Sequence, residues 1–480
     1  MNGDDASCSF QKRRIKHWDA LVETKYRPDR PARFYHELLQ QYYAFLVTPG
    51  LRVLELGCGQ GDLLNRIRPA FGVGIDFSEK MIKRASKRYP ELHFCCADAH
   101  ACPLKTKFDV IVLSDLVNDV WDVQQLFETI KPLCHNKTKV IVNFFNEVWR
   151  PPLAFARRRG WAADVLEQSW LSLHDVTNLM ELAGFESLNN FTRVLFPLDW
   201  PLLSTLFNRY LVHFYPFSIL ALTIFVVARP VFSNDDENQA DAKQVSVIVP
   251  ARNEAGNIKQ IIETIPPLGK ETEIIFVEGG SADNTLHTIQ ELIPRYPEKS
   301  IRLYQQKGTG KGDAVRLGFE KAQGDILMIL DADLTVSPSY LPRFYKAIRL
   351  GRGDFINGVR LVYPMEEQSM RFFNKLGNKF FSWSFSWLLG QPIKDTLCGT
   401  KVLTKSDYQL IARNRSYFGD FDPFGDFDLL FGAARLNMKI TDIPIRYRAR
   451  QYGDTNISRW KHGFVLLRMV IFAARRLRFI

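Results

Sequence analysis

The sequence predicts an α/β protein of two domains, and three observations favour this. The chain has 480 residues, which is roughly three times the usual length of a single domain. Short apolar runs of strand length alternate with helical patterns in both halves. Residues 233–243 are polar and acidic, as is typical of a linker. We therefore expect domains at residues 1–232 and 244–480.

The composition is that of a globular protein, with 46% hydrophobic and 24% charged residues. The formal net charge of +11 suits anionic partners: nucleotides, an anionic membrane surface or nucleic acid. We expect no nucleic acid, because the sequence has no zinc-finger spacing or RNA-recognition signature. Seven cysteines without a Cys-x-x-Cys pair fit reduced thiols. The first twenty residues have no apolar core, so a cytoplasmic protein without a secretory signal is expected.

A strand and a glycine turn open the N-terminal half. Residues 51–56 form an apolar strand that enters "GCGQGDLL", where Gly57, Gly59 and Gly61 begin a helix. Such a turn is by itself weak evidence of nucleotide binding. The next strand, however, ends at Asp76, about twenty residues further on, where an acid can accept both ribose hydroxyls.

The alternation of strand and helix continues beyond this turn. A third strand precedes Asp98, a fourth ends at Ser114 and Asp115, and a fifth spans residues 139–144. An amphipathic helix is expected before the first strand, at residues 31–48. This order predicts a largely parallel sheet covered by helices.

Residues 35–230 resemble a class I S-adenosylmethionine-dependent methyltransferase of Rossmann-like fold, through "LELGCGQGDLL", "GIDFS" and the later Asp98. The resemblance implies that the following residues bind S-adenosylmethionine: Glu55, Gly57, Gly59, Asp76 and Asp98. Of these, Asp98 would contact the adenine. A dinucleotide-binding fold is the alternative, but such folds commonly show Gly-x-Gly-x-x-Gly, whereas this turn is Gly-x-Gly-x-Gly.

The methyl acceptor stays open. Asp115, Asp119 and His174 are candidate bases for a hydroxyl acceptor, and no spacing singles one out. A structural role for His174 at a helix start fits equally well.

Residues 210–228 carry no charge and are long enough for a membrane span. His213, Pro216 and the β-branched "LTIFVVARP" favour instead a loop followed by a buried edge strand. That strand would be the reversed last strand of the methyltransferase fold.

Two closely spaced carboxylates mark the C-terminal half. In "GDILMILDADLTVSP", residues 326–330 form a buried strand, and Asp331 and Asp333 follow it. An Asp-x-Asp at the end of a parallel strand offers hard oxygen ligands to Mg²⁺ or Mn²⁺. Alone, the motif is more often a pair of solvated turn residues.

The surrounding motifs favour a nucleotide-diphosphate site. Residues 245–249 form a strand that Pro250 is expected to end, and Asn253 and Glu254 lie in the next turn. A further strand, residues 273–277, enters the glycine-containing turn "EGGSADNT". The later loop "KGTGKGD" supplies cations for phosphate.

Residues 245–460 resemble a family-2 glycosyltransferase of the GT-A fold, in particular dolichol-phosphate or polyprenyl-phosphate hexose synthases. The matching motifs are "VSVIVPARNE", "GKGDAVRLGFEKAQGDILMILDADL", "DTLCGTKVL" and "DFDLLFGAARLNMKITDIPIRYRARQYGDT". The resemblance implies nucleotide-sugar contacts by Pro250, Asn253, Glu254, Glu278 and Lys311. It implies a catalytic set of Asp331 and Asp333, which would hold the metal and diphosphate, with Asp395, Arg360, Arg371 and Arg450.

This half departs from the family pattern at two points. Relatives usually carry two adjacent acids where this chain has Glu278 and Gly279, which leaves the nucleotide base open. They often have Lys where this chain has Asn456, although Arg459 or Lys461 could supply that phosphate contact.

The acceptor of the sugar is either a lipid phosphate or a glycan hydroxyl. A lipid phosphate is already anionic near neutral pH and needs no strong base, whereas a hydroxyl needs a carboxylate. Asp395, Asp426 and Asp428 are the candidates for that role.

Residues 459–480 contain six Lys or Arg and no acid. Lys461, Arg468 and Arg475 would form one stripe of a helix. The apolar face beside it would include Phe464, Leu467, Ile471 and Ala474. This pattern is typical of a helix at an anionic membrane surface, and a helix docked on its own domain is the alternative.

The sequence thus predicts a bifunctional transferase in the cytoplasm or at the cytoplasmic face of a membrane. It would use a nucleotide sugar and S-adenosylmethionine on a polyprenyl phosphate, glycan or related lipid. Two alternatives are an N-terminal domain that only binds its cofactor and an enzyme that methylates nucleic acid.

Overall fold

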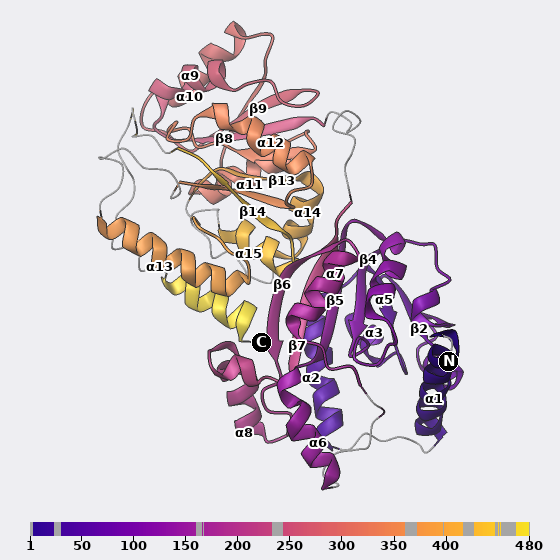
Figure 1. Ribbon diagram of the computed structural model, residues 1–480. Coiled ribbons are helices and arrows are strands. Elements are labelled where there is room, and N and C mark those ends of the chain that lie inside the picture. Colours follow the sequence, from indigo (N-terminus) through magenta and orange to yellow (C-terminus); the bar gives the residue numbers. More distant parts are fainter. Residues whose placement is uncertain are drawn as a thin grey trace. The chain divides into compact units, whose positions relative to one another are not determined.

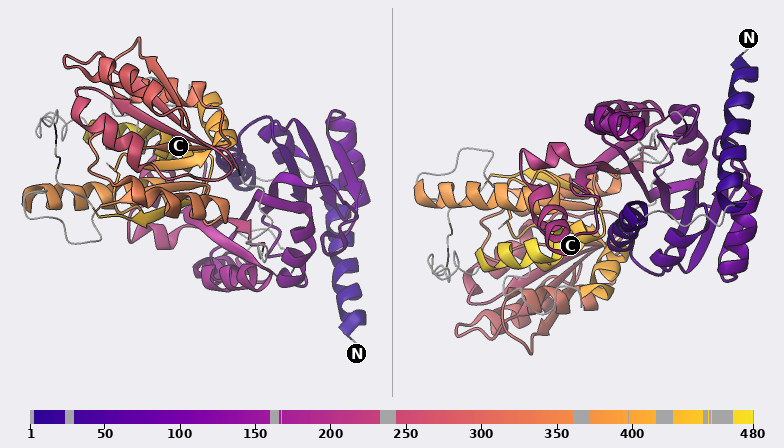
Figure 2. Two further views of the ribbon diagram at one scale, coloured as in Figure 1. Left: turned by 90° about the horizontal axis from the view of Figure 1, so that it is seen from above. Right: turned by 90° about the horizontal axis from the view of Figure 1, so that it is seen from below.

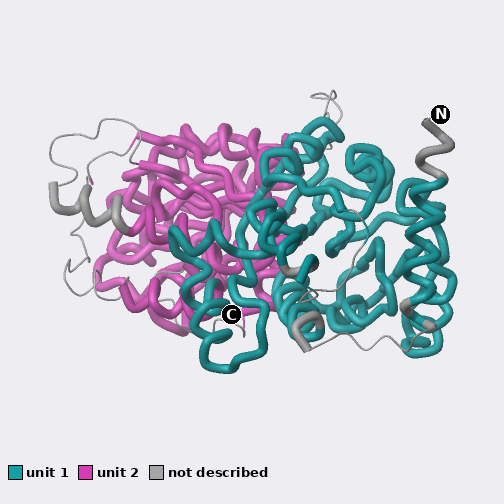
Figure 3. Tube along the Cα trace, turned by 60° about the horizontal axis from the view of Figure 1, so that its bottom comes forward, with its two compact units in different colours: residues 1–233, 478–480 teal, residues 234–477 magenta. Residues whose placement is uncertain are grey.

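Figure 1 shows the computed structural model of the chain. It describes residues 3–23, 30–159, 166, 168–232, 243–360, 372–396, 398–415, 427–446, 450, 452 and 467–479. Contacts divide the chain into two compact units, residues 1–233 with 478–480 and residues 234–477 (Figure 3). Of the expected linker, residues 233–242 lie outside the described part.

The first unit contains a seven-stranded sheet in the order β3-β2-β1-β4-β5-β7-β6. Its strands are β1 (Arg52–Leu56), β2 (Phe71–Asp76), β3 (His93–Cys96), β4 (Phe108–Ser114), β5 (Cys134–Phe145), β6 (Phe185–Arg193) and β7 (Thr223–Pro230). The first five strands pair in parallel, and β7 is antiparallel to both of its neighbours. This is the expected Rossmann-like sheet with one reversed strand.

The prediction that "LTIFVVARP" forms an edge strand is wrong. Strand β7 lies inside the sheet between β5 and β6, and all eight of its residues are buried. Its run of apolar residues suits a strand covered on both faces, whereas the more polar β6 takes the edge. Among the described residues, no helix is long and apolar enough to cross a membrane.

This unit also contains helices, some of which cover the two faces of the sheet. They are α1 (Gly3–Glu23), α2 (Arg30–Leu46), α3 (Asp62–Ile67), α4 (Glu79–Arg88), α5 (Val123–Ile130), α6 (Arg150–Arg158), α7 (Leu173–Leu182) and α8 (Pro201–Ser204). Helices α5 and α7 contribute to the apolar core on one face, and α2 and α3 contribute to the core on the other. Helix α1, which the sequence did not predict, is a single straight helix in indigo in Figure 2.

The second unit contains a mixed sheet in the order β10-β9-β8-β11-β13-β12-β14, as expected for a GT-A-like fold. Its strands are β8 (Val245–Ala251), β9 (Thr272–Glu278), β10 (Ser300–Gln305), β11 (Ile326–Ile329), β12 (Phe355–Val359), β13 (Lys401–Thr404) and β14 (Ile440–Pro444). Its helices are α9 (Ile258–Thr264), α10 (Thr285–Leu292), α11 (Lys311–Lys321), α12 (Leu341–Arg349), α13 (Phe372–Leu389), α14 (Lys405–Arg413) and α15 (Phe427–Arg435). Strands β10, β9, β8 and β11 run parallel, and β13 is antiparallel to both neighbours.

Pro250 does not end its strand, contrary to expectation, because β8 continues to Ala251. The partner strand β11 pairs with β8 only as far as Ile248. At Pro250 the ladder therefore runs on the β9 side alone. A residue without an N–H group is tolerated where one side of a strand has no partner.

Candidate functional sites

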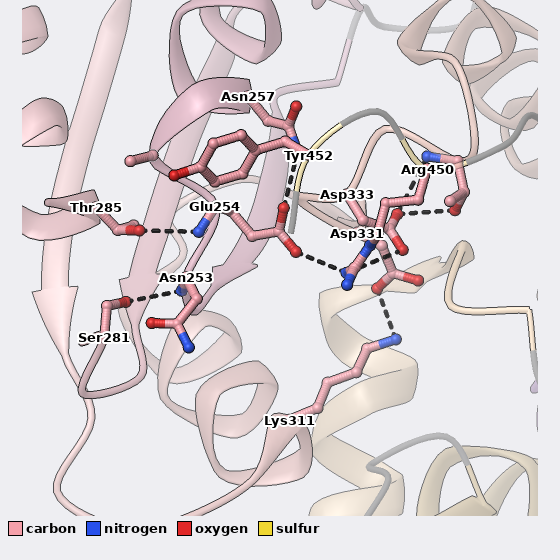
Figure 4. Close-up of polar contacts among 12 residues, drawn as sticks. Asn253, Glu254, Asn257, Ser281, Thr285, Lys311, Asp331, Asp333, Arg450 and Tyr452 are labelled. Atoms are coloured by element: carbon pink, nitrogen blue, oxygen red, sulfur yellow. Dashed lines mark hydrogen bonds and ion pairs between the residues drawn. The ribbon is translucent and has the colours of Figure 1, made fainter. Parts of the chain in front are cut away.

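Three neighbouring parallel strands of the second unit bring the predicted sugar-nucleotide residues to one sheet edge. Strand β9 ends at Glu278, β8 leads to Asn253 and Glu254, and β11 leads to Asp331 and Asp333. The carboxyl ends of parallel strands share an edge, and ligands of open α/β sheets bind there. Figure 4 shows the side chains of Glu254, Asp331 and Asp333 beside those of Lys311 and Arg450.

Hydrogen bonds tie the turn after β8 to the turn after β9. Asn253 adopts a left-handed backbone with φ of 57°. Its N–H donates to Ser281 Oγ at 3.0 Å, and its side-chain oxygen accepts from the Ala282 N–H at 2.7 Å. Glu278 is 4% exposed and accepts from the Ser281 N–H at 2.6 Å. Both turns are therefore preorganised at the edge.

Glu254 links this edge to Arg450. Its backbone N–H donates to Thr285 Oγ1 at 2.9 Å, and its carboxylate accepts from Asn257 at 2.7 Å and from Arg450 Nη2 at 2.7 Å (Figure 4). Burial raises the pKa of Glu254 to about 7, although the Arg450 cation acts against that rise. The Glu254 carboxyl is thus held between an amide and a guanidinium at this edge.

The two aspartates of the Asp-x-Asp motif have different partners. Asp331 lies 2.6 Å from Lys311 Nζ, and although burial opposes the change, this cation holds the pKa of Asp331 below its usual value. Asp333 accepts from the Thr335 N–H and hydroxyl at 3.1 and 2.7 Å and lies 3.5 Å from Arg450 Nη2. Burial and the nearby Asp331 charge raise the pKa of Asp333.

The pair fits a divalent cation that shares its ligands with a substrate. Among the described residues, no group of three or more His, Cys, Asp or Glu is arranged to hold a metal. Asp331 and Asp333 would therefore supply two carboxylates, and phosphate and water oxygens would supply the remaining ligands, as is usual for Mg²⁺. A bound cation would favour the ionised form of Asp333, whose pKa is raised without one.

Gly399 is a site residue that sequence reasoning did not single out, although it lies within "DTLCGTKVL". A Cβ at this position would stand 1.9 Å from Asp331 Oδ2 and 2.4 Å from Lys311 Nζ. The fully buried Lys401 follows, donates to the Cys398 carbonyl, and helps to lower the pKa of Asp331. A larger residue here would therefore force the Asp331–Lys311 ion pair to shift.

Arg360 and Asp395 bind each other. Arg360 donates from Nε and Nη2 to the two carboxylate oxygens at 2.7 and 2.9 Å, and Asp395 is 3% exposed. Similarly, Asp428 accepts from Arg415 Nε at 2.8 Å. Each carboxylate therefore has a guanidinium partner.

The remaining predictions for this unit concern segments that are only partly described. The following residues lie outside the described part: Arg371, Asp426, Asn456, Arg459, Lys461 and Phe464. In the C-terminal helix, Leu467 and Ile471 are exposed beside Arg468 and Arg475, while Ala474, expected on the same apolar face, is buried. The helix therefore packs on one side and leaves two apolar residues open.

The glycine turn of the first unit has the backbone that its sequence suggests. Gly57, Gly59 and Gly61 have φ of 72°, 51° and 79°, a region that favours glycine. A Cβ on Gly57 would lie 2.9 Å from Leu116 Cδ1, whereas one on Gly59 would meet nothing within 4 Å. The space above Gly59 is thus open to a ligand.

The acids near this turn fit a nucleoside with a charged tail. Asp76 accepts from the N–H groups of Gly59 and Ser78 at 3.0 and 2.9 Å, and burial raises its pKa. Glu55 is 2% exposed, and its Oε2 is buried without a hydrogen-bond partner. A buried acceptor that lacks a donor costs free energy, so an amino group or hydroxyl of S-adenosylmethionine would suit it.

Helix α1 lies across this same edge. Gln11 donates to Asp98 Oδ2 at 2.9 Å, and Asp98 also binds His100, which lowers the pKa of Asp98. Arg14 Nε donates to Asp119 Oδ1 at 2.8 Å and is almost fully buried. The helix therefore contacts the residue expected to bind adenine as well as a candidate base.

The three candidate bases differ in their surroundings. Asp115 follows β4 with φ of 54°, accepts from the Tyr35 hydroxyl at 2.9 Å and from Asn143 Nδ2 at 2.5 Å, and has a pKa that burial raises to about 7. Asp119 is paired with Arg14, and His174 is exposed in the first turn of α7. Leu116, the residue after Asp115, lies beside Gly57 of the glycine turn. Of the three candidate bases, Asp115 is therefore the one that is next in the sequence to a residue beside this turn.

Comparisons with known proteins match each half separately. Residues 246–410 match the family model described as glycosyl transferase family 2, and residues 47–183 match the one described as methyltransferase domain. A curated relative, the dolichol-phosphate mannosyltransferase of Pyrococcus furiosus, is 36% identical over 220 residues. The match covers 45% of this chain and 59% of the relative, so the chain spans less than two thirds of the relative's length.

Solved structures also match each half. An S-adenosylmethionine-dependent methyltransferase from Mesorhizobium loti is 21% identical with a TM-score of 0.30, and the match covers 38% of this chain and 92% of that chain. Glucosyl-3-phosphoglycerate synthase from Mycobacterium tuberculosis, in complex with Mn²⁺, uridine diphosphate and glucosyl-3-phosphoglycerate, is 18% identical with a TM-score of 0.37. That match covers 52% of this chain and 85% of that chain.

Proposed function

We propose that this chain, which joins a methyltransferase domain to a family-2 glycosyltransferase domain, transfers both a hexose and a methyl group. The second unit would move the hexose from a nucleotide-diphosphate sugar to a polyprenyl phosphate or glycan. The observation that carries this proposal is the convergence of Asp331 and Asp333 with Lys311 and Arg450 at one sheet edge. The two carboxylates suit a metal cation, and the two cationic side chains suit the diphosphate that the cation would accompany.

Each of these side chains has a task in the proposed sugar transfer. Asp331 and Asp333 would hold Mg²⁺ or Mn²⁺, which neutralises the leaving diphosphate when bound. Lys311, the first residue of α11, would add its charge to the same phosphates. Glu254 and Glu278 would bind the ribose or base, with Pro250 and Asn253 beside them. Arg450 is placed to exchange its contact with Asp333 for the anionic donor or acceptor.

A lipid phosphate is the favoured acceptor. Asp395 and Asp428 are each paired with an arginine, which suits structural roles better than proton abstraction. A phosphate acceptor is its own nucleophile and needs no such base. The likeness to a dolichol-phosphate mannosyltransferase supports this choice. With such an acceptor, the enzyme would work at the cytoplasmic face of a membrane.

The first unit would transfer the methyl group of S-adenosylmethionine. Glu55, Gly57, Gly59, Asp76 and Asp98 would bind the cofactor, which supplies an activated methyl when bound. The protein's part is to align an acceptor with that methyl. Asp115 would remove the proton of a hydroxyl acceptor. The alternative is that this unit binds its cofactor without turnover and regulates or docks the other unit.

Mass spectrometry tests both activities. The full chain is incubated with a panel of nucleotide sugars, with polyprenyl phosphates or glycans, and with or without S-adenosylmethionine. We expect a polyprenyl-phosphate hexose as the product. When S-adenosylmethionine is present, we also expect a product whose mass is higher by one methyl group. Products on glycans alone would overturn the lipid-phosphate proposal, and no methyl mass on any product would favour the docking alternative.

Calorimetry tests the cofactor site directly. Asp76→Ala should weaken S-adenosylmethionine binding by about 1–3 kcal/mol, since the ribose hydroxyls lose a charged acceptor. Gly57→Val should weaken it further, because the side chain would clash with Leu116 in a backbone conformation that valine disfavours. Unchanged affinity in Asp76→Ala would remove the ribose role.

A further inference from the structure

The connection between β6 and β7, residues 194–222, exposes an unusual amount of apolar surface. Ten of the twenty large hydrophobic side chains that are exposed in the described part of the chain belong to it. Leu202 and Tyr215 protrude most, at 89% and 81% exposure, and Trp200 is 58% exposed. Large apolar surfaces that stay exposed on a folded protein often mark an interaction site.

This segment has a small core of its own, and Phe479 packs on it against the rings of Tyr210, His213 and Phe214. Leu195, Val212 and Ala221 are buried together beneath it. The Asn208 side chain accepts from the Phe196 N–H and donates to the Phe196 carbonyl, both at 2.8 Å. The exposed apolar residues are therefore carried by a segment that its own buried cluster and hydrogen bonds stabilise.

Residues 147–159 continue the same surface. Trp149 Nε1 donates to the Leu220 carbonyl at 2.8 Å, which joins the two segments. Val148 and Phe155 are exposed there, beside the exposed Arg158 and Arg159. We call residues 147–159 and 194–222 together the apolar platform. It contains five arginines against one glutamate and one aspartate.

The platform lies at the cofactor edge of the sheet. Strand β5 ends at Phe145, and Asn146, the next residue, donates to the Ile219 carbonyl at 2.8 Å. Three residues earlier on the same strand, Asn143 donates to Asp115. The same edge carries the glycine turn at the end of β1. A partner seated on the platform would therefore meet the proposed site of methyl transfer.

We propose that the apolar platform docks on an anionic lipid bilayer and presents the methyl-transfer edge to a lipid or lipid-linked acceptor. Exposed Leu and Ile would enter the acyl boundary, and Trp200 and Tyr215 suit the headgroup level. The exposed side chains of Arg150, Arg158, Arg159 and Arg209 would bind lipid phosphates. This inference rests in part on the proposed lipid-phosphate acceptor, which would confine the other substrate to the same membrane.

Vesicle sedimentation of the full chain tests the proposal. The probes are vesicles of phosphatidylcholine with and without phosphatidylglycerol. Leu202→Ser with Tyr215→Ser should lower binding at least about tenfold, since two large apolar side chains no longer leave water. The matched control is Leu182→Ser, which removes an equally apolar residue, 62% exposed on α7. That control should bind as the unsubstituted protein does.

A second pair of variants tests the charge. Arg158→Glu with Arg159→Glu should remove the preference for phosphatidylglycerol while leaving the melting temperature unchanged. Equal vesicle binding by the Leu202/Tyr215 variant and the unsubstituted protein would overturn the proposal. So would self-association that this variant abolishes without any vesicle binding, because the platform would then join two copies. No transfer chemistry enters the assay, so its failure is distinct from failure of the proposed activities.

Discussion

At the scale of single residues, Gly399 sets the geometry of the sugar-nucleotide site. Gly399→Ala would place a Cβ within 2.4 Å of both Asp331 and Lys311, so the ion pair has to shift. We expect sugar transfer to fall about tenfold or more, because misplacement of a catalytic group by an ångström is costly. Steady-state transfer assays with titrated Mn²⁺ measure the loss.

Gly351→Ala is the matched control, since its Cβ would meet nothing within 4 Å in a loop after α12. It should lower stability slightly, through its left-handed backbone, and leave transfer intact. Full activity in Gly399→Ala would show that the position of Asp331 does not matter for transfer.

Asp115 makes the stability of the first unit depend on pH. Burial raises the pKa of Asp115 to about 7, so the folded state binds its proton more tightly than the unfolded state. The corresponding stability is fully present below about pH 4 and is lost as the pH rises through about 7. The melting temperature, measured by calorimetry between those pH values, should therefore fall as the pH rises. We expect this fall to be smaller in Asp115→Asn.

A control of opposite sign is available in the same unit. The hydrogen bond from His135 lowers the pKa of Asp109, so that carboxylate contributes stability above its unfolded pKa. Asp109→Asn should leave the decline towards neutral pH in place. A decline that persists unchanged in Asp115→Asn would contradict the account of Asp115.

Some site residues were predictable from sequence because short motifs fix them locally. Asp331, Asp333 and Glu254 follow strands, and neighbouring parallel strands bring strand ends together whatever the rest of the fold does. Gly399 and the pairing of Arg360 with Asp395 were not predictable. Both depend on which distant segment lies beside β11 and β12, and a linear pattern does not contain that information.

At the scale of elements, α1 is held by polar contacts across the sheet edge that we propose binds S-adenosylmethionine. Arg14→Ala should release it, because a nearly buried guanidinium bound to Asp119 is lost. A hydrogen bond between charged groups is worth about 1.5–3 kcal/mol, so we expect S-adenosylmethionine to bind about tenfold more weakly. Proteolysis of the helix should also become faster, and added cofactor should slow it.

Arg13 provides the comparison, because it is the exposed neighbour of Arg14 on the same helix. Arg13→Ala should change neither cofactor affinity nor proteolysis. Equal effects of the two substitutions would mean that the helix responds to net charge and not to the contact with Asp119.

The elements that sequence reasoning missed or misplaced share a physical cause. Helix α1 has no strong apolar stripe. It packs through polar side chains such as Gln11 and Arg14, and such contacts leave no apolar period in the sequence. Strand β7 was predicted correctly as a strand but placed at the edge. Its position depends on β6, whose polar side chains suit the edge better. Strands and helices with clear apolar periods, by contrast, followed from the sequence.

At the scale of the whole molecule, the proposed activities use different units. Asp333→Ala should abolish sugar transfer, because the metal and diphosphate lose a ligand. It should leave S-adenosylmethionine binding unchanged, since the cofactor residues belong to the other unit. Transfer assays and calorimetry on the same preparation check both halves. Retained sugar transfer would remove the metal role of Asp333, and lost cofactor binding would show that the units are coupled.

The interior position of β7 also matters while the protein is being made. Residues 223–230 leave the ribosome after every other strand of the first sheet, yet they pair with both β5 and β6. Until they emerge, the nascent chain carries an unpaired strand edge at β5, and open edges invite association with other chains. The first unit thus has a vulnerable interval during translation, which ends only when its last strand arrives.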